Sequence, residues 1–221
     1  MKISDDTPLN AEDLPQVIPV FPLNGALLLP HSSRPLNIFE PRYLNMIDDA
    51  MAAERIIGMV QIVSKDLRER PSLAPVGCAG KITTFSEAAD GRYLITLTGV
   101  SRFRLGDELP GYTPYRRARV DFSPFEADLT PLSRDDDDRE ALLEPLRHYL
   151  NQRGMRIDWA AVKNAPVEAL VNSLAMALPF EAVELQALLE AATLAERRRT
   201  LVALLRIDGA YGVDEPPPSV Q

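Results

Sequence analysis

The chain has 221 residues, 46% hydrophobic and 25% charged, a globular composition whose length suits one large domain or two small ones. Its formal net charge of −8 disfavours nucleic acid as a partner, because polyanions bind basic surfaces. The single cysteine, Cys78, excludes an internal disulfide and fits a reducing compartment.

The N-terminal segment is polar and acidic and contains no apolar stretch of the kind found in signal peptides. No apolar run in the sequence reaches the ~18 residues that a membrane-spanning helix needs. We therefore expect a cytoplasmic protein with no membrane partner. Its first part, residues 1–13, is predicted to be flexible.

Residues 14–122 predict a β-barrel subdomain. Apolar or alternating stretches indicate strands at 17–23, 56–63, 77–88, 92–105 and 115–122, and a further short apolar run occupies 26–30. The pairs Asn24-Gly25 and Asp90-Gly91 are typical of tight hairpin turns. About six short strands with this spacing favour a closed or nearly closed barrel.

One helix is expected within the barrel sequence. Leu44, Ile47 and Met51 share one helical face, and they follow a short strand that contains Leu36 and Ile38. Pro41 suits the first turn of this helix, because a proline there loses no helical hydrogen bond.

The junction between that strand and helix, Phe39-Glu40-Pro41-Arg42-Tyr43, has two interpretations. In the first it is a structural corner, with the Glu40 carboxylate near the free amides of the first turn and the Tyr43 ring buried. In the second, Phe39, Arg42 and Tyr43 rim a groove that binds an extended peptide. The two are compatible, because a rigid corner is a suitable place for a binding edge.

Arg102 and Phe103 form a second candidate for partner binding. The alternative for this pair is a core phenylalanine at a strand end beside a surface arginine.

The remainder of the chain predicts a linker and a helical bundle. Residues 123–138 are rich in proline, serine and aspartate and are interpreted as an acidic linker before a bundle over 139–210. Helices are expected at 139–150, 166–178, 183–192 and 194–205, with Pro145 marking a kink or a later start in the first of them. The proline-rich segment 211–221 is predicted to be a disordered tail.

The sequence carries no recognisable catalytic or metal-binding motif. It lacks the phosphate-binding loop, the paired histidines of zinc proteases, a Cys-x-x-Cys pair and the Gly-x-Ser-x-Gly elbow. His31 and His148 lie in different halves without metal-ligand spacing. The run Asp135–Asp138 lacks the alternation and the glycine of a calcium loop, and is interpreted as a solvated helix approach. We expect no enzymatic activity, no metal and no cofactor.

Two segments resemble the N-terminal domain of Lon proteases. In residues 14–51 the similarity lies in Pro22-Leu23, in Pro30 and in Pro35-Leu36 followed by Arg42. In residues 76–105 it lies in the Asp-Gly hairpin and in Gly99 followed by Arg102-Phe103. The sequence of residues 39–43 is more similar to that of stand-alone Lon-domain proteins, and of Lon domains beside RING fingers, than to that of the protease itself.

This resemblance, which spans about residues 14–208, implies an α+β fold in which a PUA-like β pseudo-barrel with one inserted helix precedes a C-terminal helical bundle. It also implies a role in protein recognition, as in the related domain of cereblon. We therefore expect a non-enzymatic module that binds unfolded or partner protein segments, such as an adaptor in protein quality control. Protease activity is not expected, because the nucleotide loop and the proteolytic Ser-Lys part are absent from this sequence.

The alternative function is an RNA-binding PUA-like module. Its support is the cluster of basic and aromatic residues Tyr112, Tyr115, Arg116, Arg117 and Arg119, which combines phosphate-binding charge with stacking rings. The net charge opposes it. The sequence makes no prediction of the oligomeric state.

Overall fold

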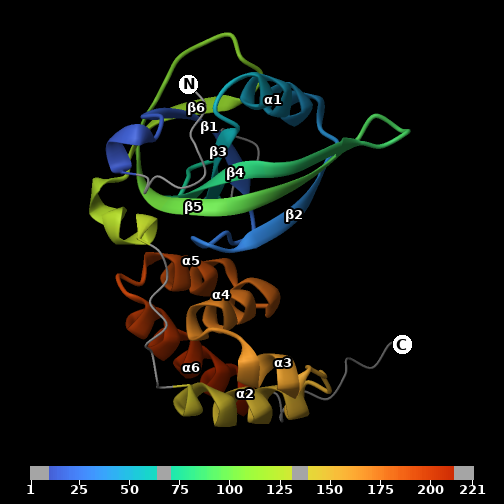
Figure 1. Cartoon of the computed structure of the whole chain (residues 1–221), viewed down its shortest axis with the longest axis vertical. Coiled ribbons are helices and arrows are strands. Elements are labelled where there is room, and N and C mark those ends of the chain that lie inside the picture. Colours follow the sequence, from blue (N-terminus) through green and yellow to red (C-terminus); the bar gives the residue numbers. More distant parts are fainter. Residues whose placement is uncertain (1–9, 64–70, 131–138, 212–221) are drawn as a thin grey trace, which may run out of the picture.

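The computed structural model describes residues 10–63, 71–130 and 139–211. The elements, in chain order, are η1 Ala11–Asp13, β1 Val17–Leu23, β2 Ser33–Ile38, α1 Pro41–Ala52, β3 Ile56–Gln61, β4 Val76–Glu87, β5 Tyr93–Glu108, β6 Arg116–Asp121, η2 Ser123–Leu129, α2 Glu140–Gln152, α3 Trp159–Asn164, α4 Val167–Ala177, α5 Ala182–Glu190 and α6 Leu194–Tyr211. The mixed α+β architecture predicted from the sequence is confirmed: strands and α1 occupy one end of the molecule and the helices α2–α6 the other (Figure 1).

The six strands form one sheet in the order β2-β5-β4-β3-β1-β6, and an additional pairing between β5 and β6 closes it into a barrel. The pairings are antiparallel apart from that of β1 with β3, which is parallel. β5 makes this closure possible through its length, because its first part pairs with β2 and its last part with β6. The hairpin of β4 and β5 extends beyond the barrel (Figure 1).

The apolar run 26–30 does not form a strand, although Gly25 adopts the positive φ of 65° that suits the predicted turn. β1 pairs with β3 on one side and with β6 on the other, so no hairpin partner is taken from this run. Leu27, Leu28 and Leu29 are all buried, which a strand with one solvent face would not allow. The run is therefore a buried connection.

The approach of this connection to β5 depends on a glycine. A Cβ atom on Gly99 would lie 2.1 Å from the carbonyl oxygen of Leu29, so no other residue fits there without a shift of the backbone. The amide of Gly99 donates to Ser32 O at 2.8 Å, and the amide of His31 donates to Gly99 O at 3.0 Å. These bonds hold the start of β2 against β5.

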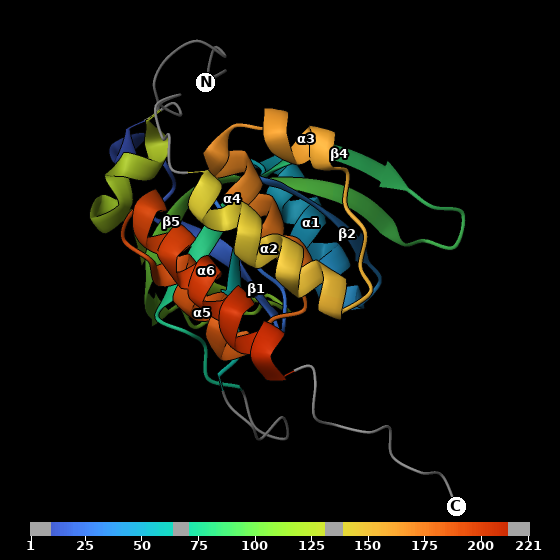
Figure 2. The ribbon, with the colours of Figure 1, turned by 90° about the horizontal axis from the view of Figure 1, so that it is seen from below.

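The helical half confirms the predicted helices and adds one. α2 continues through Pro145, with Leu142 and Leu146 buried on either side of it. The additional helix is α3, which Asp158 caps by accepting hydrogen bonds from the amides of Ala160 and Ala161. Seen from below, α2, α4 and α6 lie across one end of the strands (Figure 2).

The barrel and the helices share a continuous core. One cluster of buried side chains includes Ile38 and Leu97 from strands together with Leu142, Val171 and Leu188 from helices. A second, smaller cluster around Phe103 lies within the barrel and η2. The two halves therefore pack as one folded unit.

Several sequence predictions fall outside the described residues: the flexible segment over residues 1–9, the acidic run within 131–138 and the tail beyond residue 211. Of the segments predicted to be irregular, 11–13 and 123–129 form the short helices η1 and η2.

Candidate functional site

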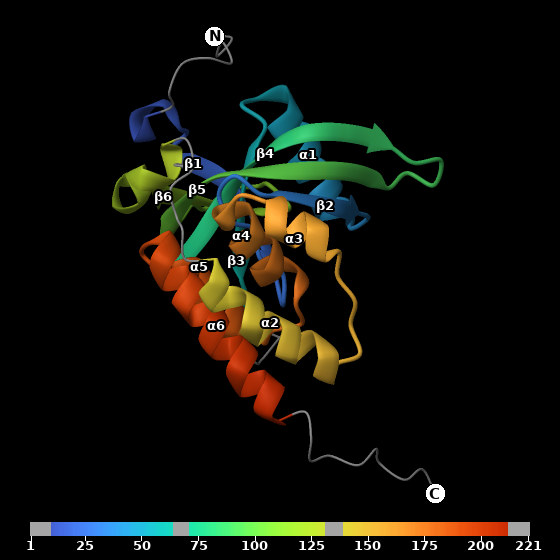
Figure 3. The ribbon, with the colours of Figure 1, turned by 60° about the horizontal axis from the view of Figure 1, so that its bottom comes forward.

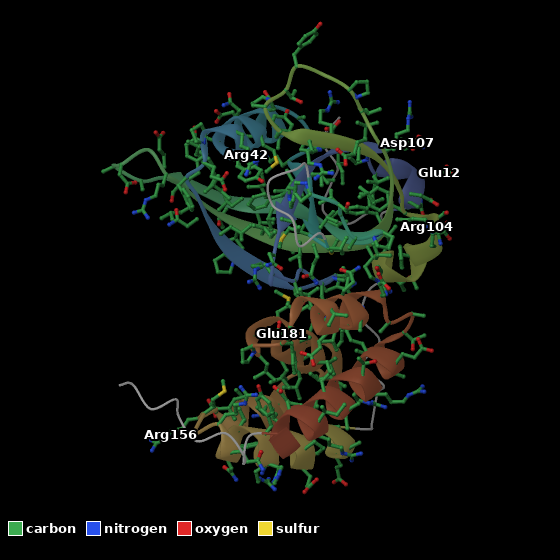
Figure 4. All side chains as sticks on the ribbon, turned by 180° about the vertical axis from the view of Figure 1, so that it is seen from behind. Glu12, Arg42, Arg104, Asp107, Arg156 and Glu181 are labelled. Carbon is green, nitrogen blue, oxygen red and sulfur yellow. The ribbon has the colours of Figure 1, made fainter. Side chains whose placement is uncertain are left out.

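The strand-to-helix corner at residues 39–43 is exposed up to Arg42. Phe39 follows β2 and is 65% exposed. Glu40 is the N-cap of α1, but its side chain makes no capping hydrogen bond; it accepts instead from Arg42 Nε at 2.9 Å, and Arg42 Nη2 lies 2.7 Å from it. Pro41 opens the helix, as predicted. The corner thus presents an aromatic ring and an ion pair to solvent, on the barrel half of the molecule, where Figure 4 labels Arg42.

Tyr43 anchors this corner to the core. It is buried, and its ring meets that of Phe21 edge-to-face with centroids 4.6 Å apart. The guanidinium of Arg42 lies over the Tyr43 ring, 4.5 Å from its centroid. Burial raises the pKa of Tyr43, and Arg42 lowers it. Tyr43 therefore positions Arg42, while Phe39 and Arg42 carry the accessible surface.

Arg102 and Phe103 lie at a buried contact between β5 and the helices. Arg102 is 3% exposed and pairs with Asp128 of η2, its Nη2 lying 2.8 Å from Asp128 Oδ1 and its Nε donating to Oδ2 at 2.8 Å. Its Nη1 donates to the carbonyls of Leu189 and Ala191 at the end of α5. Phe103 is fully buried against Phe122. The sequence interpretation of Arg102 as a surface arginine is therefore wrong, and neither side chain offers surface to a partner.

A cleft next to β2 has no counterpart among the sequence predictions. It has a volume of about 500 Å³ and lies between residues 31–35 and one side of α4, represented by Ala169, Ser173 and Met176. Figure 3 shows α4 alongside β2. The two walls are far apart in sequence, and only the packing of α4 on the barrel brings them together.

β2 also forms a margin of the sheet. In the described part of the chain it pairs with β5 alone, so its other side carries backbone groups without a strand partner. Ser33, Pro35 and Asn37 are exposed along it. The cleft lies at the start of this margin and Phe39 at its end, so the two candidate surfaces are continuous along one strand.

The predicted basic-aromatic cluster is not assembled as a surface. Tyr115 is buried and donates a hydrogen bond to Asp49 Oδ2 at 2.5 Å, while Tyr112 is fully exposed. Arg116 forms a bidentate contact with Glu108 and donates to Pro71 O at 2.7 Å. Arg117 and Arg119 remain exposed on β6. The ring of Tyr115 and the charge of Arg116 are thus engaged in contacts within the fold.

Two further kinds of site, a metal centre and a membrane-spanning helix, are not found among the described residues. Within the described ranges, no group of three or more histidine, cysteine, aspartate or glutamate side chains is arranged to hold a metal ion. No helix in the same part of the chain has the length and apolar character to cross a membrane.

Comparison with known protein families identifies the family to which this chain is similar. Residues 17–206 match the family described as the ATP-dependent protease La (LON) substrate-binding domain. The chain belongs to this family. The match is to the substrate-binding domain, and not to the ATPase or protease parts of Lon.

Curated Lon proteases are similar to this chain over a part of their own length. Lon protease 2 of Myxococcus xanthus is 31% identical over 116 residues, which cover 51% of this chain and 14% of the relative. Lon protease 2 of Thermus thermophilus is 26% identical over 201 residues, covering 88% of this chain and 24% of the relative. The chain therefore spans a minor part of the length of these relatives.

Solved Lon N-terminal domains share the fold. The Lon N-terminal domain protein from Xanthomonas campestris superposes with a TM-score of 0.59 at 22% identity, covering 85% of this chain and 97% of that one. The N-terminal domain of the Mycobacterium avium complex Lon protease also gives 0.59, at 18% identity, with coverages of 86% and 97%.

Proposed function

We propose that this Lon-family domain is a non-enzymatic module that recognises unfolded or partner protein segments, and that it acts as an adaptor in protein quality control. Its family supports a role in substrate recognition. The observation that carries the proposal is the margin formed by β2, whose second side has no strand partner among the described residues and which leads directly to the exposed Phe39 and Arg42.

The physical basis is the addition of an extended segment to this margin. Backbone groups of an edge strand can pair with a segment of almost any sequence, and neighbouring side chains then add selectivity. Phe39 supplies an apolar contact at one end, since a large exposed aromatic loses water-accessible area when covered. Pro35 removes one N–H donor from β2, which limits self-association along the edge. The site therefore suits short segments held partly by side chains.

The alternative RNA-binding function is less well supported. Tyr115 is unavailable for stacking because it is buried, and the charge of Arg116 is balanced by Glu108. A chain of net charge −8 also repels a polyanion.

Fluorescence anisotropy with a labelled, permanently unfolded protein tests the proposal, with a labelled RNA of similar size for comparison. We expect saturable binding of the unfolded protein that changes little between about 50 and about 200 mM salt, whereas phosphate-driven binding falls steeply over that range. Phe39→Ala is expected to weaken binding by about tenfold, the scale of an exposed aromatic anchor.

The matched control is Tyr112→Ala, which removes another exposed ring, in the connection between β5 and β6. Circular dichroism and thermal melts establish that both variants fold. Absence of saturable binding to the unfolded protein would contradict the proposed function. Equal effects of the two substitutions would contradict its location at Phe39.

A further inference from the structure

We propose that the cleft between β2 and α4 binds the carboxylate side chain of an aspartate or glutamate in an extended segment lying along β2. This inference rests on the proposed function and names a chemical feature of the segment. The cleft is lined by residues 31–35 on the barrel side and by Ser173 with apolar residues, Met176 among them, on α4. None of the described residues that line it is acidic.

Arg34 is the central group of this site. Its Nη1 donates to Leu27 O at 3.2 Å and to Met176 O at 3.5 Å, which fixes the side chain across the gap between β2 and α4. No carboxylate of the described residues forms an ion pair with it. Burial lowers the pKa of Arg34, since the charged form is partly removed from water. A guanidinium whose hydrogen bonds go to carbonyl groups alone is strongly stabilised when an anionic partner binds to it.

The surroundings of Arg34 complete an anion site of carboxylate size. Ser173 lines the cleft, and its hydroxyl can donate a hydrogen bond to a carboxylate oxygen. Ser33 Oγ lies 3.3 Å from Thr98 Oγ1, which is its contact within the sheet. This local basic character stands out in a chain whose net charge is −8.

One acidic residue lies close to the cleft and limits the role of His31. Burial raises the pKa of Glu168, while His31 and Arg197 lower it, so the charges of Glu168 and His31 interact. A carboxylate of the protein thus already lies within electrostatic reach of His31. No carboxylate of the described residues forms an ion pair with Arg34, which is the cation available to a ligand.

The position of the cleft favours a side chain of an extended segment over a free ion. Ser33, Arg34 and Pro35 line the cleft and also belong to β2, so a segment beside β2 passes over its mouth. Successive side chains of such a segment point to opposite faces, and one of them is directed toward α4. An acidic side chain at that position reaches Arg34 while the backbone follows the strand.

Three labelled twelve-residue peptides test this, each with β-branched and aromatic residues at alternate positions to favour extended structure. The first carries one central glutamate and an amidated C-terminus, the second replaces glutamate by glutamine, and the third has glutamine with a free C-terminal carboxylate. By anisotropy we expect the glutamate peptide to bind about tenfold more tightly than the amidated glutamine peptide, as a partly buried charge-assisted hydrogen bond implies. Global electrostatics predicts the opposite order, because the protein is acidic.

Two positions in the cleft, Arg34 and Ser173, are substituted to test whether this preference arises there. Arg34→Gln is expected to reduce the ratio of affinities to about one, and Arg34→Lys to restore part of it, since the charge is kept without the forked geometry. Ser173→Trp fills the cleft from an exposed position on α4 and should abolish the preference even if Arg34→Gln perturbs folding. The control is Arg119→Gln, which removes an exposed charge on β6 and should leave the ratio unchanged.

Equal affinity for the glutamate peptide and its amidated glutamine counterpart, or a preference that persists in Arg34→Gln and Ser173→Trp, would overturn the inference. A preference for the free C-terminus over glutamate would also overturn it, in favour of chain-end recognition. Failure of all three peptides while the unfolded protein still binds overturns the carboxylate site alone. Failure of the unfolded protein as well overturns the proposed function.

Discussion

Arg102 of β5 and Asp128 of η2 form a buried, bidentate ion pair at the contact between the barrel and the helices. The same guanidinium donates to carbonyls at the end of α5 and lies 4.7 Å from the ring centroid of Phe125. A single side chain thereby connects the barrel, η2 and the helical half.

We expect Arg102→Ala to destabilise the protein by about 3–5 kcal/mol, because Asp128 is left as a buried charge without its partner. Urea unfolding followed by circular dichroism measures this. Arg92→Ala is the matched control, because its ion pair with Asp90 is exposed to solvent and contributes little to stability. A similar small effect for both substitutions would show that the buried pair is not important for stability.

Gly99→Ala should be strongly destabilising, since the new Cβ would overlap the carbonyl oxygen of Leu29 and force β5 away from the buried connection. Such overpacking typically costs about 1–3 kcal/mol. Gly111→Ala serves as control, because nothing lies within 4 Å of the position that its Cβ would occupy. Thermal denaturation of both variants makes the comparison, and equal melting temperatures would contradict the close approach described at Gly99.

The thiol of Cys78 should be unreactive in the folded protein. Cys78 is buried in β4, and its burial raises the pKa of the thiol far above the usual range, so that almost no thiolate forms near neutral pH. A chromogenic disulfide reagent is expected to titrate one thiol per chain in urea and almost none without it. Rapid labelling of the native protein in mildly alkaline buffer would show that β4 opens readily.

Tyr115 should make stability decrease in alkaline solution. Burial, together with the hydrogen bond to Asp49, raises its pKa to about 12, above the ordinary value of 10.0. Between these two values the unfolded chain has lost the proton that the folded chain keeps. The contribution of protonated Tyr115 to folding stability is therefore complete below pH 10 and is lost as pH rises through about 12.

The difference between the wild-type protein and Tyr115→Phe isolates this effect, since other tyrosines titrate in both proteins. We expect the urea midpoint of the wild type to fall more steeply between about pH 10 and about pH 12 than that of the variant. Parallel curves would contradict the raised pKa.

Much of the fold follows from local patterns. α4 and α5 begin after Pro166 and Pro179, and α6 begins after Thr193, whose hydroxyl accepts a hydrogen bond from the amide of Glu196. The apolar faces of these helices are regular. The run 26–30 is harder to predict, because its leucines are buried on all sides and an apolar run alone does not reveal whether a strand partner exists. α3 is short and has only one buried side chain, Val162, which gives no periodic signal.

The candidate site is less accessible to prediction. Phe39, Pro41 and Arg42 are identifiable because their order is unusual at a strand end, whereas the position of Arg102 depends on η2 and α5, which lie far along the chain. The cleft at Arg34 has no local signature: its walls are joined by contacts such as that of Arg34 with Met176, 142 positions apart in sequence. Only tertiary packing creates it.

The shared core also determines how the cleft can respond to a ligand. Ile38 of β2 and Ala175 of α4 belong to the same cluster of buried side chains, so neither wall can move without disturbing close-packed neighbours. We therefore expect a pre-organised receptor that loses little conformational entropy on binding. The ordering cost then falls almost wholly on the incoming segment, and segments that are already extended before they arrive should bind fastest and most tightly.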